Sequence, residues 1–509
     1  MTRPEPARTR LSRRAAASAG VLAAAAGAAC GHLVAAFLDP ASSPVIAVGS
    51  TVIDVTPTPV KDWAVQTFGT RDKPVLVGSV LVVTLLLAAV AGVLARRSRS
   101  AGVGLLLALV ALATAAAASR PVAGATDVLP GLATGVVGVA VLMALTRGIA
   151  RPPAAAGAGP DRRGLLLGSG AVALASVAAA TAGQWLAGAG RLAAVRLPGP
   201  AKPLPPLPRG LEERLPGVSP FRTPTAQFYR VDTNLTVPSV DPASWRLVVD
   251  GAVGRRLELS LDDLLAMPLE EHDITLTCVS NTVGGQYLGS TRWLGVPLQR
   301  LLDRAGVRSG PDMLLSTAVD GFTISTPLDV ATDGRPTLVA VGMAGRPLPP
   351  EHGFPARLVT PGIYGFVGAT KWLARLTLTT YAEHTAYWTR RGWATRAPIK
   401  ISSRIDTPAP LSTIRPRDTV VGGVAWAQEH GIAAVELSID GGPWQPARLG
   451  PDAGVDYWRQ WYLPWHATPG RHELAVRARS RDGLVQTPVR ASPFPDGSSG
   501  IQHVVITVT

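Results

Sequence analysis

The chain has 509 residues, and its 49 Lys and Arg against 35 Asp and Glu give a formal net charge of +14. This length exceeds that of one ordinary domain, and the mean hydropathy of +0.23 is high for a protein that lies wholly in water. The sequence has no basic stripe interleaved with aromatic residues, so the positive charge does not indicate nucleic-acid binding.

Apolar segments of membrane-spanning length fill the first part of the chain. They are rich in Ala, Gly, Leu and Val, and they occupy residues 15–38, 74–95, 101–119, 128–145 and 164–186. Each is close to the roughly 20 residues that cross a bilayer core. Buried helices of a water-soluble protein are the alternative, but so many runs in succession favour a membrane domain of five transmembrane helices over residues 1–190.

Arginines predict the orientation of these helices. They are concentrated in the N-terminal tail and in the loops after the second and fourth runs, as with Arg13, Arg14, Arg96, Arg97, Arg99, Arg147 and Arg151. The positive-inside rule therefore places the N-terminus in the cytoplasm and everything after residue 190 outside the cell. The sequence predicts a multi-pass protein of the cell membrane.

Arg162 and Arg163 immediately precede the fifth apolar run. An arginine pair before such a run is a recognised export signal, although Arg-Arg also serves plain topology. Ser12-Arg13-Arg14 before the first run is a competing candidate, but four further spans follow it. We expect the later pair to direct twin-arginine export of a folded domain.

A proline-rich linker is predicted over residues 191–225, because its prolines forbid regular helix and favour an extended tether. From 226 to 398, strand-like runs such as Trp245–Val249 alternate with brief helical ones. Ser260–Leu265 is typical of a capped helix, and Pro297–Arg304 places proline at the favoured first helical position. A mixed α+β domain follows.

Residues 399–509 have a different pattern. Short, mostly alternating runs such as Ala434–Ile439 and Glu473–Ala478 are separated by turn signals such as Asp440-Gly-Gly-Pro443. This spacing predicts an antiparallel β-sandwich.

Cys278 is one of only two cysteines; the other, Cys30, lies in the first apolar run. Cys278 ends the strand-like run Ile274–Thr277 and enters a loop that contains Gly284 and Gly285. A lone thiol in this position has three interpretations: a buried small hydrophobe, a nucleophile or a soft metal ligand. With Cys30 in the membrane, we expect no intrachain disulfide.

Sequence blocks around Cys278 resemble, in their order, the sulfite oxidase family of molybdopterin enzymes over roughly residues 205–509. The blocks are Phe228-Tyr-Arg230, Trp245-Arg-Leu-Val-Val-Asp-Gly251, Ile274 to Asn281, Trp293-Leu-Gly-Val-Pro-Leu298, Pro347 to Gly362 and Lys371-Trp-Leu373. The resemblance implies a molybdopterin-dependent oxidoreductase in which the Cys278 thiolate binds molybdenum. It also implies an Ig-like C-terminal domain, which often mediates dimerisation in this family.

The same resemblance implies a set of cofactor-binding residues. They are Tyr229, Arg230, Cys278, His352, Arg357, Gly368, Thr370 and Lys371. Arg357 is suited to bidentate phosphate binding, Lys371 to acting as a point charge, and Gly368 with its neighbours to offering backbone amides. The ordinary alternatives are an ion pair for Arg357 and a satisfied loop histidine for His352.

Two departures from the family pattern concern the substrate. Val341 stands where sulfite-oxidising members have a tyrosine, and Thr282, Val283 and Gly284 stand where they have arginines soon after the cysteine. A pocket for a doubly charged oxyanion needs fixed cations to offset desolvation. Sulfite is therefore a poor substrate prediction, and a neutral or weakly charged oxo-acceptor is favoured.

The sequence contains no haem-attachment motif and no iron–sulfur cysteine set, so electrons must pass to or from a separate partner. A quinone and a cytochrome are the candidates, and His32 as the only histidine of residues 1–190 excludes a bis-histidine haem within those helices. The leading hypothesis is a membrane-anchored, extracytoplasmic molybdenum oxidoreductase. Its alternatives are a sulfoxide reductase of the protein-repair kind and a catalytically inactive membrane scaffold.

Overall fold

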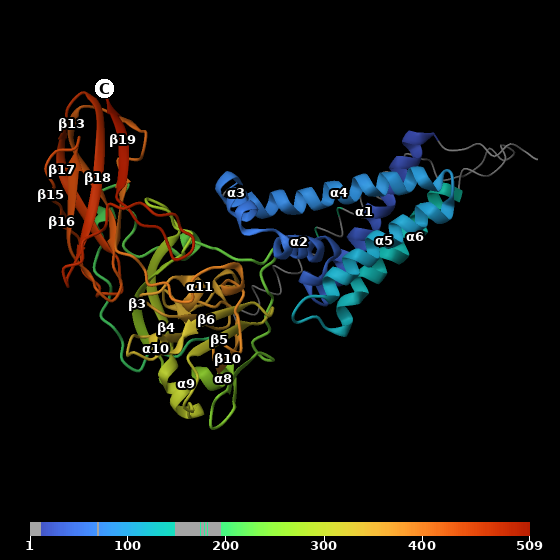
Figure 1. The fold of residues 1–509 in the computed structure, drawn as a ribbon, viewed down its shortest axis with the longest axis horizontal. Coiled ribbons are helices and arrows are strands. Elements are labelled where there is room, and N and C mark those ends of the chain that lie inside the picture. The colour runs from blue at the N-terminus through green and yellow to red at the C-terminus, as the bar shows by residue number, and fades with distance from the viewer. Residues whose placement is uncertain (1–11, 69–70, 148–173, 175–177, 179–180, 182–194) are drawn as a thin grey trace, which may run out of the picture. The chain divides into compact units, whose positions relative to one another are not determined.

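The protein comprises two compact units. The computed structural model describes residues 12–68, 71–147 and 195–509, together with residues 174, 178 and 181. Contacts group the chain into Met1–Gly190 with Asp232–Ser239, and Arg191–Val231 with Val240–Thr509. The first unit is helical and the second is built mainly of strands, coloured blue to cyan and green to red in Figure 1.

The helices of the first unit follow the predicted apolar runs. They are α1 Arg13–Phe37, α2 Pro44–Val55, α3 Thr58–Phe68, α4 Asp72–Ala95, α5 Arg99–Ala118 and α6 Leu129–Arg147. Within the described residues, α1, α4, α5 and the segment Ala125–Thr146 are long and apolar enough to cross a membrane. The predicted fifth span, 164–186, lies almost entirely outside the described residues. The short helices α2 and α3 were not predicted.

Small residues allow α1 and α4 to approach backbone to backbone. A Cβ added at Gly20 would lie 2.0 Å from the Ala88 carbonyl oxygen, and one at Gly92 would lie 2.0 Å from the Ala16 carbonyl oxygen. Membrane helices associate through such small-residue contacts because lipid provides no hydrophobic driving force between them. The Ala- and Gly-rich composition thus fixes the packing as well as the hydropathy.

The part of the second unit that contains Cys278 has two sheets. One has the order β2-β1-β10-β5-β6, and the other has the order β3-β4-β7-β8 with β9 also paired to β7. The strands are β1 Arg246–Gly251, β2 Leu257–Ser260, β3 Glu270–Thr277, β4 Leu288–Pro297, β5 Met313–Ala318, β6 Thr323–Pro327, β7 Leu338–Met343, β8 Arg346–Pro347, β9 Arg357–Val359 and β10 Leu373–Thr379. Buried Leu and Val side chains from both sheets form the main core.

Short helices connect these strands. They are α8 Leu261–Leu265, α9 Leu298–Ala305, α10 Leu328–Ala331 and α11 Gly365–Gly368. Ser260 caps α8 as predicted, and its hydroxyl accepts a hydrogen bond from the amide of Asp263. The prediction for Pro297 was wrong by one position. This proline is the N-cap of α9, with the extended ψ of 128°, because its backbone still belongs to β4.

The C-terminal part is rich in strands, as predicted. One sheet has the order β11-β13-β17-β16 and the other β12-β19-β18-β14-β15. The strands are β11 Ser402–Thr407, β12 Thr413–Ile414, β13 Arg417–Trp426, β14 Ile432–Ile439, β15 Gln445–Pro446, β16 Arg448–Leu449, β17 Arg459–Ala467, β18 Gly470–Ser480 and β19 Gln502–Val508. Both sheets contribute side chains to one apolar core. Strand β12 pairs with β19 in parallel, and the other strand pairs are antiparallel.

The proline-rich segment is extended, but from residue 195 onward it is not a free tether. The amide of Ala201 donates to the Leu269 carbonyl at 2.8 Å, and the Arg292 guanidinium donates to the Pro205 carbonyl at 2.7 Å. Prolines lack amide donors but keep strong acceptor carbonyls, so an arginine can hold the segment against the sheet.

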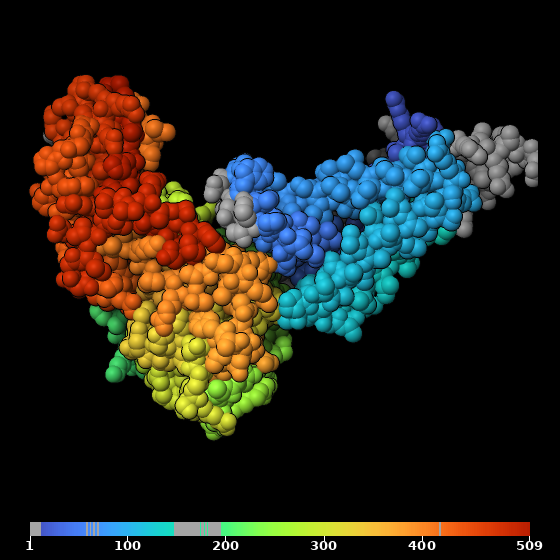
Figure 2. Space-filling view, in the orientation of Figure 1, coloured from blue at the N-terminus to red at the C-terminus, as the bar shows by residue number. Residues whose placement is uncertain are grey.

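The C-terminal part packs directly against the sheets that precede it. Figure 2 shows its orange-to-red surface in contact with the rest of the second unit. Gln428 donates to the Thr275 carbonyl on β3 at 3.0 Å, and the Thr275 hydroxyl accepts from the Trp458 amide at 2.8 Å. The strand that leads to Cys278 is therefore held from both sides.

Candidate active site

Cys278 directly follows β3 and begins a closed loop that returns to β4. Its amide donates to the Tyr287 carbonyl at 2.9 Å, and its carbonyl accepts from the Asn281 amide at 3.0 Å. The Asn281 side-chain oxygen accepts from the Tyr287 amide at 2.8 Å. These bonds fix residues 278–287, here called the cysteine loop, as a rigid extension of the hairpin.

Residues of the C-terminal part hold the cysteine loop in place. Ser498 donates from its hydroxyl to the Asn281 carbonyl at 2.6 Å, and Arg404 donates to the Gly285 carbonyl at 2.8 Å. Gly284 has a φ of +78°, and a Cβ there would lie 2.5 Å from the side-chain nitrogen of Gln502. Glycine is required at this position both for the left-handed backbone and for the close contact.

The Cys278 thiol is partly buried and interacts electrostatically with two phenols. Burial raises the pKa of this thiol, and hydrogen bonding from Ser280 opposes the rise in part. The side chains of Tyr229 and Tyr364 lie near enough to interact electrostatically with it. Burial also raises the pKa of Tyr364 to about 12 and that of Tyr229 further, so both phenols are neutral hydrogen-bonding groups at pH 7.

Arg357, on β9, is a buried cation without an acidic partner among the described residues. Its guanidinium donates to the carbonyls of His352 at 3.2 Å and Ala369 at 3.4 Å, and it lies over the Trp293 ring at 5.1 Å. Only 6% of the residue is exposed, and its Nε has no hydrogen-bond partner. Burial lowers the pKa of Arg357 to about 10, which leaves it charged at neutral pH.

His352 lies beside Arg357 and is neutral. Its Nε2 is 3.1 Å from the Thr225 carbonyl, which can only accept, so Nε2 carries the proton and Nδ1 is left as an acceptor. Burial lowers the pKa of His352, and the charge of Arg357 lowers it further. The Phe228 ring contacts the imidazole edge to face, with centroids 5.6 Å apart.

The remaining predicted site residues have local partners. The Gly368 amide donates to the Tyr364 carbonyl at 3.2 Å, and Ile363 fills the space of a Cβ at Gly368, so this glycine also serves packing. The Thr370 hydroxyl is 2.5 Å from that of Ser316. Lys371 donates to the Glu351 carbonyl at 3.2 Å, and Arg230 is exposed. The structure thus gathers Tyr229, Cys278, His352 and Arg357 most closely.

Buried polar atoms without partners cluster around α11. In the described part of the chain they include Arg357 Nε, Thr360 Oγ1 and Thr277 Oγ1. Thr360 borders Gly368 at one end of α11, and the Thr277 backbone borders Gly365 at the other. Because buried polar groups are rarely left unpaired, this cluster is a place where a polar ligand would complete the hydrogen bonding.

Two arginines, one beside the cysteine loop and one on β4, are paired with acidic residues. Arg404 pairs with Asp406 at 2.6 Å, and Arg292 pairs with Asp273 at 2.7 Å. Val341 is 2% exposed and packs in the main core, so it presents no polar group. Within the described residues, no group of three or more His, Cys, Asp or Glu could by itself hold a metal ion.

Sequence reasoning missed two residues of the site. Trp293 supplies the ring beneath Arg357, and Tyr364 supplies a phenol near Cys278. Trp293 begins one of the recognised blocks, and Tyr364 follows another by two residues. Their positions in the sequence therefore carried a signal, but their contacts depend on strands that are distant in the chain.

Comparisons with known proteins match the part of the chain that contains these residues. A family model described as an oxidoreductase molybdopterin binding domain matches residues 234–388. Mitochondrial sulfite oxidase of Rattus norvegicus is 30% identical over 309 residues, which cover 52% of this chain and 56% of the rat protein. The uncharacterized oxidoreductase YuiH of Bacillus subtilis is 32% identical over 179 residues, which cover 35% of this chain and 87% of YuiH.

Among solved structures, the sulfane dehydrogenase SoxCD from Paracoccus pantotrophus is similar with a TM-score of 0.50 and 25% sequence identity. The match covers 57% of this chain and 83% of that one. The chain spans a little over half the length of the mammalian sulfite oxidases that it matches.

Proposed function

Because the chain belongs to the sulfite oxidase family of molybdopterin-dependent oxidoreductases, we propose that it is a membrane-anchored, extracytoplasmic enzyme that moves two electrons between a small substrate and a separate redox partner. The cofactor of the family is molybdenum-molybdopterin. When bound, this cofactor supplies two-electron redox chemistry and oxygen-atom transfer. The protein's own residues bind it, orient it and shape access to it.

The observation that carries the proposal is the uncompensated charge of Arg357. A buried cation without an anion costs several kcal/mol, so a structure that keeps one normally supplies its counter-charge as a ligand. Here the counter-charge would be the phosphate of the cofactor, which guanidinium binds in bidentate fashion. The orphaned Arg357 Nε is a donor ready for such an anion. Thr360 Oγ1 adds a second polar group without a partner.

Cys278 is the proposed molybdenum ligand. Burial disfavours its free thiolate, so the anion becomes stable only when a cation is bound at the sulfur. The cysteine loop, fixed by the Asn281 bonds, would present the sulfur with little loss of conformational freedom on binding.

Neighbouring residues would fix the orientation of the cofactor. His352, held by Thr225, keeps Nδ1 as an acceptor, and the Tyr229 and Tyr364 phenols stay protonated as donors. Lys371 adds positive charge from the loop after α11, while Arg230, Gly368 and Thr370 complete the proposed binding set.

The substrate is proposed to be neutral or weakly charged. Arg404, which donates to the Gly285 carbonyl of the cysteine loop, is paired with Asp406, and Arg292 on the adjoining strand β4 is paired with Asp273. With Arg357 assigned to the cofactor phosphate, a dianion such as sulfite would lose its hydration without gaining Arg404 or Arg292 as a partner. This favours a sulfoxide reductase as the second candidate function, since a sulfoxide carries a polar oxygen without net charge.

The helical unit is proposed to anchor the enzyme with the N-terminus in the cytoplasm. Four candidate spans within the described residues support anchoring, and the excess of arginine in alternate loops supports the orientation. Export by the pair Arg162 and Arg163, an Ig-like description of the C-terminal part and dimerisation through it belong to the same proposal. The redox partner would be a quinone or a cytochrome.

Metal analysis of the purified full-length protein tests this proposal. We expect about one molybdenum atom per chain in the wild type and in the Cys30→Ser control. Dye-linked assays on the same sample should show turnover with a sulfoxide and little with sulfite. Protein that remains metal-free in a molybdenum-replete host would favour the scaffold alternative, whereas rapid sulfite turnover would overturn the substrate assignment alone.

A further inference from the structure

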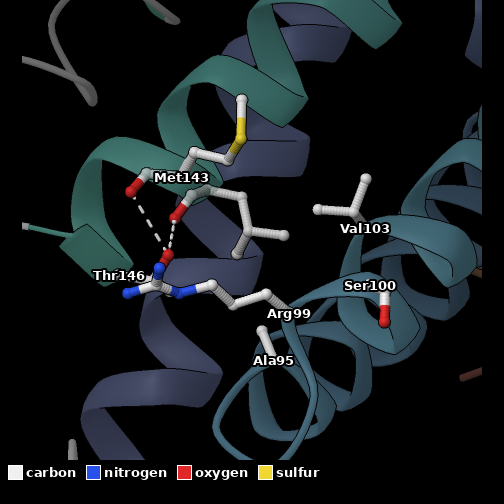
Figure 3. A pocket seen from close by; sticks show the side chains of 7 residues that line it. Ala95, Arg99, Ser100, Val103, Met143 and Thr146 are labelled. Carbon is white, nitrogen blue, oxygen red and sulfur yellow. Dashed lines mark hydrogen bonds between the residues drawn. The ribbon is translucent and has the colours of Figure 1, made fainter.

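A cavity opens at one end of the helical unit, where α4, α5 and α6 meet. Its volume is about 190 Å³, and its walls include the apolar side chains of Val103, Leu142 and Met143. Arg99 and Ser100, from the first turn of α5, supply polar groups. Figure 3 shows the Arg99 side chain extending from α5 toward α6, alongside the apolar side chains. The cavity thus combines apolar walls with a cationic group.

This end of the bundle carries an excess of positive charge. α1 begins at Arg13, α4 is followed by Arg96 and Arg97, and α6 ends at Arg147. The contacts of Gly92 with Ala16 and Gly20 set the end of α4 beside the beginning of α1. Among the described residues, no acidic side chain lines the cavity.

Two arginines at the cavity lack an anionic partner within the described residues. Arg99 makes no ion pair there, and the Nε of Arg96, which directly follows the lining residue Ala95, is buried without a hydrogen-bond partner. Thr146, which also lines the cavity, is uncharged, and its hydroxyl donates to the carbonyls of Leu142 and Met143. A molecule with an anionic group and apolar chains would both pair with these arginines and contact the apolar walls of the cavity.

We propose that this cavity binds the headgroup of an anionic phospholipid, with Arg99 paired to the phosphate and Ser100 as a further donor. The lipid chains would follow Val103 and the α6 side chains toward the exposed apolar surface of the bundle, where Leu107 is 46% exposed. Basic pockets between membrane helices are a recognised form of lipid site. This inference rests on the membrane anchoring in the proposed function.

Free phosphate is the other source of the same charge, and the apolar walls argue against it. Phosphate alone would leave the Leu142 and Met143 side chains without an apolar contact, whereas the acyl chains of a lipid would cover them. The helices around the cavity are the ones long and apolar enough to span a bilayer, so lipid is also the abundant neighbour.

Native mass spectrometry of the detergent-solubilised full-length protein, titrated with dioleoyl phosphatidylglycerol or dioleoyl phosphatidylcholine, tests the proposal. We expect selective retention of phosphatidylglycerol by the wild type. Arg99→Gln should weaken that retention about fivefold, in line with the loss of one basic residue near a lipid phosphate. Arg97→Gln, an exposed neighbour that does not line the cavity, is the matched control and should change little.

Arg99→Lys keeps the charge and should restore most of the selectivity. Equal losses in Arg99→Gln and Arg97→Gln, or equal retention of the two lipids, would overturn the site in favour of diffuse attraction. Displacement of phosphatidylglycerol by millimolar inorganic phosphate would also overturn it. Molybdenum content measured on the same sample reports on the proposed function separately, since metal-free protein with lipid selectivity would contradict only that function.

Discussion

The two sides of the candidate site differ in how well their polar groups are satisfied. On the cysteine side, neutral groups hold one another, as with Ser498 and the Asn281 carbonyl at 2.6 Å. On the arginine side, Arg357 is a buried cation with carbonyl acceptors only and an orphaned Nε. The completed network accounts for the fold of the cysteine loop, whereas the incomplete one indicates a missing ligand.

A control for this distinction exists within the same domain. Arg335 is partly buried, but Asp333 and Glu429 pair with it at 2.6 and 2.7 Å, and Pro361 accepts a further hydrogen bond. Its charge is therefore compensated by the protein itself. Arg357 lacks an acidic partner and Arg335 has two, so replacing each arginine should affect the stability of the apoprotein in opposite directions.

Cys278→Ser should have the largest effect. A hydroxyl is a hard, weakly acidic ligand that does not replace a thiolate at molybdenum, so turnover should fall on the order of a thousandfold or more. The loop bonds use the backbone of Cys278, so the unfolding temperature of the apoprotein should remain close to wild type. Cys30→Ser is the matched control and should keep both metal and activity. Full activity in Cys278→Ser would remove the ligand assignment.

Arg357→Met should separate cofactor binding from stability. Losing the phosphate partner should lower cofactor occupancy roughly a hundredfold at limiting cofactor, because charge-assisted pairs are the strong ones. The apoprotein, relieved of an uncompensated buried charge, should be as stable as wild type or up to about 4 kcal/mol more stable.

Arg335→Met should behave in the opposite way. Removing it leaves Asp333 and Glu429 without their cation, but both acids are partly exposed to water, so the apoprotein should lose only about 1–2 kcal/mol. Urea unfolding of both apoproteins and cofactor quantification of both holoproteins give the comparison. If Arg357→Met destabilises the apoprotein as much as Arg335→Met does, then Arg357 has a structural role.

Local sequence signals were enough to predict some elements and not others. Ser260 followed by Asp263 indicated a capped helix because the cap is a contact over three residues. Cys278 and Arg357 were found through the order of the family blocks. The clamp of Ser498 on Asn281 joins residues 217 positions apart, so nothing in the local pattern could reveal it.

The same reasoning explains the errors. Pro297 was expected inside α9, yet β4 continues through it, because pairing with Leu338 on β7 outweighs the local preference for the first helical position. The proline-rich segment was expected to be a tether, since sequence shows which residues cannot form helix but not which side chain, here Arg292, will bind their carbonyls.

Ser498→Ala should moderately destabilise the cysteine loop. Removing a buried hydroxyl that satisfies the Asn281 carbonyl should cost about 1–2 kcal/mol of folding free energy and speed amide exchange across the cysteine loop. Molybdenum content should stay high, because the ligand itself is intact. Ser492→Ala, whose exposed hydroxyl contacts the Phe494 carbonyl, is the control and should change neither quantity. Exchange unchanged in Ser498→Ala would show that the loop is rigid without the clamp.

His352 should give the smallest effect, as a pH dependence of the apoprotein. Its folded pKa is lowered by burial and by Arg357, so below about pH 6.5 the unfolded chain binds the proton more readily. The contribution of His352 to the free energy of unfolding is therefore complete above pH 6.5. It is lost as the pH falls, by less than about 1.4 kcal/mol per pH unit. Apo His352→Gln should lose less stability on acidification than the wild-type apoprotein.

His472 offers a control, because its contribution to stability should change with pH in the opposite direction. Hydrogen bonding to Asp440, 2.7 Å away, raises the folded pKa of this histidine, so its contribution is present below pH 6.5 and is lost as the pH rises. His472→Gln should therefore make the loss on acidification larger, while His352→Gln makes it smaller. Urea unfolding of the three apoproteins between pH 5 and 8 measures both. Because a bound phosphate would offset the charge of Arg357, the His352 effect should also shrink in the holoprotein, and an unchanged effect would mean that no anion binds beside it.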